Sequence, residues 1–78
     1  MQFIEQVKVV LKDWDCEHEG NLWAWWNSYG RYLSVTYMAG NSYLVRLYLD
    51  VTKPFSDMFN SDLGDEECLR RIREFIKP

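Results

Sequence analysis

The residues best suited to chemistry in this chain lie together in the stretch Asp15-Cys16-Glu17-His18-Glu19. A thiol two positions from an imidazole could form a nucleophile–base pair, and the alternating carboxylates could bind a metal. Nucleophilic catalysis also needs a group that orients the base and donors for an oxyanion, and no motif in the sequence supplies them. Zinc sites usually draw paired ligands from two segments, and His18 is the single histidine of the chain. We therefore expect a solvated acidic loop here, with no enzymatic activity, no metal and no cofactor.

Aromatic side chains point instead to binding. The chain has four Trp, five Tyr and four Phe in 78 residues, and each can bury about 150–250 Å². Two or three tryptophans exceed what a core of this size needs, and Trp, Tyr and Arg dominate binding hot spots. Cross-strand aromatic pairs that merely stiffen a small sheet are the alternative explanation. The candidate contact residues are Trp23, Trp25, Tyr32, Arg46 and Tyr48.

Acidic residues are segregated along the chain. Nine of the twelve lie in two stretches, residues 13–19 and 57–67, and neither stretch contains Lys or Arg. The net charge is only −3, but such clustering creates a local negative potential. Taken singly, the stretches fit a solvated loop and a helix start; together they favour a partner with a basic surface. The acidic candidates for that contact are Asp15, Glu17, Glu19, Asp65, Glu66 and Glu67.

The elements that must position these residues can be read from apolar spacing. Residues 3–14 have apolar side chains at helical intervals, and residues 65–77 repeat that pattern with acids first and bases later. Between them, runs 22–27, 31–38 and 42–51 are rich in aromatic and β-branched residues and are separated by glycine-containing links. Phe55, Met58 and Phe59 have the spacing of a short helix or packed loop. Residues 15–21 read as a polar connector.

These elements predict one domain, residues 1–78, of the α+β class. Its order is α-β-β-β-(short α)-α, with helices packed on one face of a three-stranded antiparallel sheet. Two helices can cover only one side, so the other side is expected to face solvent. By alternation we expect the core side to hold Leu33, Val35 and Tyr37 of one strand and Tyr43, Val45, Leu47 and Leu49 of the next. The first strand fits either register, because tryptophan falls on both of its sides.

The predicted order of elements resembles that of the double-stranded RNA-binding domain over most of the chain. That family holds phosphates with lysines at the start of its last helix, where this sequence has Asp65-Glu66-Glu67. None of its binding residues is therefore carried over. In size and acidity the chain also resembles small phage-encoded or mobile-element inhibitors, anti-CRISPR proteins among them, by analogy alone.

The cellular setting is inferred from what the sequence lacks. No run of about 18 apolar residues could span a membrane, and the N-terminal pattern is not that of a signal peptide. Without an export signal, Cys16 and Cys68 are expected to be thiols, with a disulfide as the alternative. We therefore expect a cytoplasmic protein.

The functional hypothesis is a non-enzymatic protein-binding module. It would be a small inhibitor or regulator that sterically occludes a basic, nucleic-acid-handling partner protein. One alternative is a nucleic-acid-binding domain that uses an aromatic sheet face, which the acidic charge disfavours. Another is a structural homo-oligomer, such as a homodimer, joined through that face.

Overall fold

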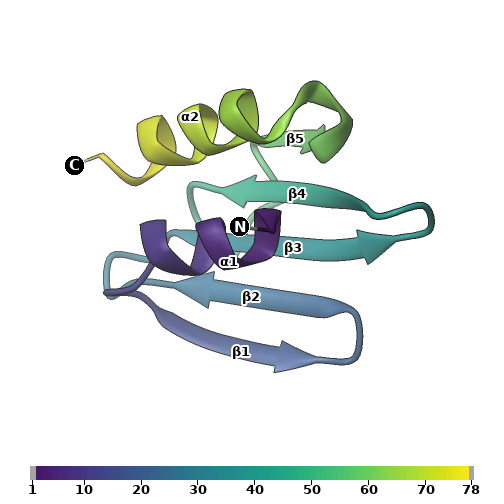
Figure 1. Ribbon diagram of the computed structural model, residues 1–78. Coiled ribbons are helices and arrows are strands. Elements are labelled where there is room, and N and C mark those ends of the chain that lie inside the picture. The colour runs from purple at the N-terminus through teal and green to yellow at the C-terminus, as the bar shows by residue number, and fades with distance from the viewer. Residues whose placement is uncertain (1, 78) are drawn as a thin grey trace.

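A five-stranded antiparallel sheet with a helix before it and a helix after it forms the fold (Figure 1). The computed structural model describes residues 2–77. The strands follow one another in the sheet as they do in the chain, so every connection joins neighbours. The elements are α1 (Phe3–Val10), β1 (Asp15–Glu19), β2 (Leu22–Trp26), β3 (Tyr32–Met38), β4 (Ser42–Tyr48), β5 (Asp57–Asn60), the 3-10 turn η1 (Ser61–Leu63) and α2 (Asp65–Ile76).

The prediction of a three-stranded sheet was wrong, because both edge strands were missed. The expected polar connector is β1, which pairs with β2 along its whole length although all of its residues are exposed. The chain folds back into β2 at Gly20, whose φ of 58° favours glycine. The expected short helix is β5, in which Phe59 faces the core and Met58 faces away. With five strands, the likeness in element order to the double-stranded RNA-binding domain no longer holds.

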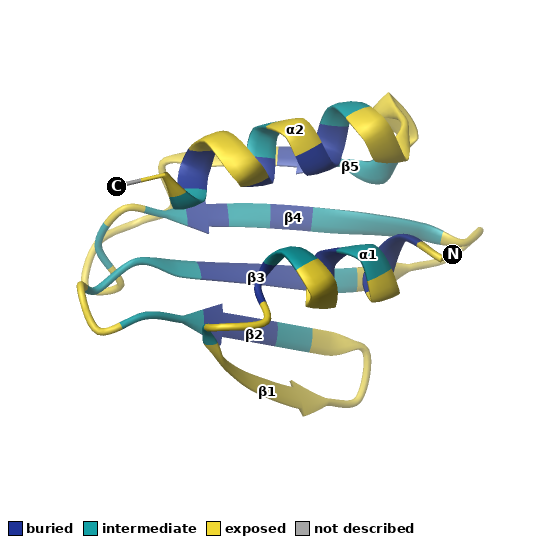
Figure 2. Cartoon of the chain, turned by 60° about the vertical axis from the view of Figure 1, so that its left-hand side comes forward, coloured by how far each residue is buried: buried dark blue, intermediate teal, exposed yellow. Residues whose placement is uncertain are grey.

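One hydrophobic core lies between the sheet and both helices (Figure 2). Alternation sends Leu33, Val35, Val45 and Leu47 into it as predicted, and the half-buried Tyr43 packs against it. The same prediction was wrong for Tyr37 and Leu49, which are exposed because Tyr37 lies next to the end of β3 and Leu49 lies beyond β4. The residues that meet them from α1 and its end are Phe3, Ile4, Val7 and Leu11, and those from α2 are Cys68, Leu69, Ile72 and Phe75. Burial of these side chains supplies most of the driving force for folding.

The end of α2 is fastened to the sheet by Arg31, which lies just before β3. Its guanidinium donates a hydrogen bond to the carbonyl oxygen of Phe75 and a second, at 3.4 Å, to that of Lys77. The same guanidinium lies 5.5 Å from the centre of the Phe75 ring. A cation at a helix C-terminus is favoured by the helix dipole and by the unpaired carbonyl groups there.

Two further expectations can be compared with the structure. Within residues 2–77, no helix combines the length and the apolar character needed to cross a membrane. Both cysteines are free, Cys16 exposed and Cys68 buried. Burial raises the pKa of the Cys68 thiol, which lies 3.6 Å from the carbonyl oxygen of Asn60.

Candidate functional site

The side of the sheet opposite the helices carries a row of aromatic residues. Trp26 pairs with Tyr32 across β2 and β3, and Tyr32 pairs with Tyr48 across β3 and β4. The two tyrosine rings meet edge to face with centroids 5.2 Å apart, and Tyr48 meets Phe55 of the β4–β5 connection at 6.3 Å. We call Trp26, Tyr32, Tyr48 and Phe55 the aromatic row, and the side of the sheet that carries it the open face.

Three carboxylates of β1 lie on the same side of the sheet as this row, and the first of them adjoins it. Asp15 lies opposite Trp26, so alternation places Glu17 and Glu19 on the open face as well. Burial, followed by the charges of Tyr48 and Glu17, raises the pKa of Tyr32. Within residues 2–77, none of the three carboxylates forms an ion pair or a side-chain hydrogen bond. We call Asp15, Glu17 and Glu19 the acidic edge; its charge is available to a partner.

Arg46 lies near the middle of the open face, opposite Ser34 of β3 and Met58 of β5. It is the one Lys or Arg in the strands that the structure describes. Its guanidinium lies 6.0 Å from the centre of the Phe55 ring, and its Nε is buried without a hydrogen-bond partner. A buried donor of this kind costs free energy until an acceptor reaches it.

The predicted tryptophan contacts lie on the other side of the sheet. Trp25 is 2% exposed and belongs to the core. Trp23 is half-buried, and its ring stacks on that of His18 with centroids 4.2 Å apart. The structure thereby settles the register that the sequence left open, and Trp26 is the tryptophan on the open face. Of the predicted aromatic and basic contacts, Tyr32, Arg46 and Tyr48 come together there.

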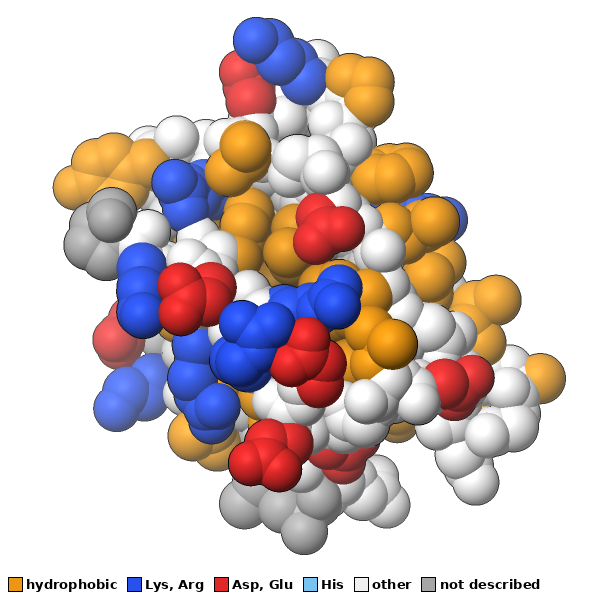
Figure 3. Space-filling model, turned by 90° about the horizontal axis from the view of Figure 1, so that it is seen from above, with side chains coloured by type: hydrophobic (Ala, Val, Ile, Leu, Met, Phe, Trp, Pro, Cys, Tyr) orange, Lys and Arg blue, Asp and Glu red, His pale blue; other side chains and the backbone are white. Residues whose placement is uncertain are grey.

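The acidic candidates of the C-terminal stretch do not lie near the acidic edge. Asp65, Glu66 and Glu67 form the first turn of α2, near β5, whereas the acidic edge lies at the opposite border of the sheet. The Glu67 carboxylate accepts hydrogen bonds from Arg70 at 2.8 Å and Arg71 at 2.9 Å, which lower its pKa to about 2. Viewed from above, the molecule shows blue and red side chains interleaved (Figure 3). Glu67 is therefore neutralised by its own helix, whereas Asp65 and Glu66 have no ion pair within residues 2–77.

The residues first considered for chemistry are divided between the two sides of β1. Alternation along β1 puts Cys16 and His18 on the helix side and the carboxylates on the open face. The His18 Nε2 lies 2.8 Å from the carbonyl oxygen of Gly20. Across the described part of the chain, no three His, Cys, Asp or Glu side chains come close enough to share a metal ion.

Comparison with protein-family models, curated proteins and solved structures finds no match to this chain. The case for a function therefore comes from the geometry of the open face.

Proposed function

We propose that the protein is a non-enzymatic binding module whose open face engages a basic surface of another protein. The observation that carries this proposal is that the aromatic row shares the open face with the acidic edge, whose Asp15 lies opposite Trp26 and whose carboxylates have no ion pair within residues 2–77. Phe55 of the β4–β5 connection packs over this side of the sheet, against Tyr48 and Arg46.

The two components would contribute differently to binding. Tyrosine and tryptophan anchors at the centre of an interface commonly contribute about 2 kcal/mol or more each. Carboxylates at its border accelerate association with a positive partner and select against a negative one. Arg46 would find an acceptor for its buried Nε at the same contact.

Nucleic acid is a poorer fit to the open face. Arg46 of β4 is the one Lys or Arg in the described strands, against three carboxylates on β1, and phosphate binding depends on neutralising charge. If the partner handles nucleic acid through its own basic surface, the open face would occlude that surface. Inhibition by steric occlusion is the specific mechanism that we propose.

The test compares a variant of the open face with a variant elsewhere. Tyr48→Ala removes the central ring of the aromatic row, and Arg73→Ala removes an exposed cation of α2. Tagged wild-type protein first captures partners from the cells that encode it, and calorimetry then measures affinity for each purified partner. We expect Tyr48→Ala to weaken binding about 30-fold or more, with Arg73→Ala unchanged and both proteins folded by circular dichroism.

Two results would overturn the proposal. Equal affinity of Tyr48→Ala and wild type would show that the open face does not bind the partner. Recovery of the bait alone, sedimenting as a dimer that Tyr48→Ala disrupts, would assign the open face to self-association.

A further inference from the structure

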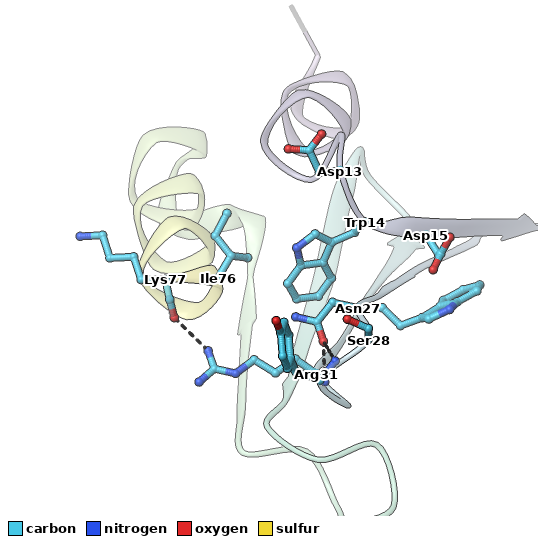
Figure 4. Close-up of a pocket in the computed structure, with 10 residues that line it drawn as sticks. Asp13, Trp14, Asp15, Asn27, Ser28, Arg31, Ile76 and Lys77 are labelled. Atoms are coloured by element: carbon cyan, nitrogen blue, oxygen red, sulfur yellow. Dashed lines mark hydrogen bonds between the residues drawn. The ribbon is translucent and has the colours of Figure 1, made fainter.

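A pocket of about 600 Å³ opens where the open face reaches the ends of both helices (Figure 4). Its aromatic lining comes from Trp14, Trp26 and Tyr29, and its carboxylates are Asp13 and Asp15. Trp26 also belongs to the aromatic row and Asp15 to the acidic edge. The pocket is therefore continuous with the surface to which we assign partner binding.

The charges in this pocket are not equally available. Its two cations are engaged elsewhere: Lys77 pairs with Glu74 at 3.1 Å, and Arg31 binds carbonyl oxygens at the end of α2. Figure 4 shows Arg31 directed toward Lys77 and away from Asp15. In the described chain neither Asp13 nor Asp15 has an ion pair or a side-chain hydrogen bond. Carbonyl oxygens do not neutralise Arg31, but Asp13 and Asp15 outnumber it, so the net unpaired charge of the lining is negative.

Aromatic faces beside free carboxylates form a site for a cation. The negative face of an indole or phenol ring attracts a cation within about 6 Å, and tryptophan does so best. A guanidinium is planar, stacks on such rings and donates to two carboxylates at once, whereas an ammonium is a compact and strongly hydrated charge. Small-ligand sites commonly measure about 300–1,000 Å³, so the pocket has room for an arginine and the backbone that carries it.

We infer that this pocket receives an arginine side chain of the protein partner. The inference rests on the proposed function and adds its recognition chemistry. Trp14 and Trp26 would flank the guanidinium, and Asp13 and Asp15 would accept its hydrogen bonds.

The direct test is a titration followed through the indole N–H signals of the four tryptophans in proton–nitrogen correlation spectra. The probes are the acetyl-methylamide derivatives of arginine, lysine and citrulline, the last a neutral analogue of arginine. We expect arginine to shift the Trp14 and Trp26 signals and to leave that of the buried Trp25 in place. Lysine should bind several-fold more weakly than arginine, and citrulline at least tenfold more weakly. Equal shifts by arginine and citrulline, or no shift with arginine, would overturn the inference.

Variants separate this inference from the proposed function. The double variant Asp13→Asn/Asp15→Asn should weaken the arginine probe at least tenfold, while Asp57→Asn, an exposed acid of β5, should not. Tyr48→Ala should still bind the probe but lose the partner. If the double variant no longer binds the arginine probe but keeps full affinity for the partner, the pocket does not bind an arginine of the partner. The proposal that the open face binds the partner would then hold, and the inference about the pocket would not.

Discussion

Truncation of two adjacent tryptophans should have different effects, mainly on folding for one and mainly on partner binding for the other. Trp25 is 2% exposed in the core, whereas Trp26 is half-buried on the open face. Replacement of a buried Trp by Ala costs about 3–5 kcal/mol, because apolar contacts are lost and a cavity remains. A stability of about 0.05–0.15 kcal/mol per residue gives roughly 4–12 kcal/mol for 78 residues. Trp25→Ala therefore removes a large share of the total and should leave a partly or wholly unfolded protein.

Trp26→Ala should keep the fold and lose the function. Its ring is half in solvent, so we expect a cost of about 1 kcal/mol, within the range of ordinary substitutions. In a domain of this size, that corresponds to a fall in Tm of about 4–8 °C, against about 12–40 °C for Trp25→Ala. Its affinity for the partner should fall by about 2 kcal/mol or more.

The assay is urea denaturation followed by far-ultraviolet circular dichroism, since fluorescence would change with the loss of either indole. Trp25→Phe and Trp26→Phe are the matched controls, and Trp25→Phe should recover part of the lost stability. Equal destabilisation by the two alanine variants would refute the reasoning, because it would make the open face a second core.

Three other predictions concern single contacts. Arg31→Met should destabilise the protein by about 2 kcal/mol in urea denaturation, because the end of α2 loses charged hydrogen bonds; an unchanged midpoint would contradict this. The folded pKa of Glu67 is lowered from 4.5 to about 2, so its stabilising contribution is present above pH 4.5 and is lost as the pH falls toward 2. The difference in Tm between wild type and Glu67→Gln should shrink over that window; a constant difference would show that pairing of the charge is not responsible. Iodoacetamide should modify Cys16 in the native protein and Cys68 only after denaturation, as mass spectrometry would show; rapid native labelling of Cys68 would contradict its burial.

The centre of the fold could be predicted from the sequence, and its edges could not. Strands β2, β3 and β4 carry apolar alternation or aromatic runs that are typical of a sheet. β1 has no apolar side chain except a thiol, so only its pairing with β2 makes it a strand. β5 has only four residues, and its two apolar side chains, Met58 and Phe59, fit one turn of a helix as well as a strand.

The site was predicted in part for a similar reason. Tyr32, Arg46 and Tyr48 could be placed on one face because the opposite face of their strands is uniformly apolar. For β2 the alternation of residue types does not show which side faces the core, because Trp23 and Trp25 lie on one side and Trp26 on the other. Packing of the helices against Trp25 decides the register. A small Ala24 on the same side as Trp26 was the one available signal, since it leaves that side poor in core volume.

The free border of β1 has a consequence for behaviour at high concentration. An unpaired strand edge is a template on which a second copy can add, and chains of such additions become fibres. If two β1 strands paired antiparallel, their carboxylates would lie opposite or diagonal to one another and repel. The charges that we assign to recognition should thus also oppose polymerisation of the folded protein through this edge.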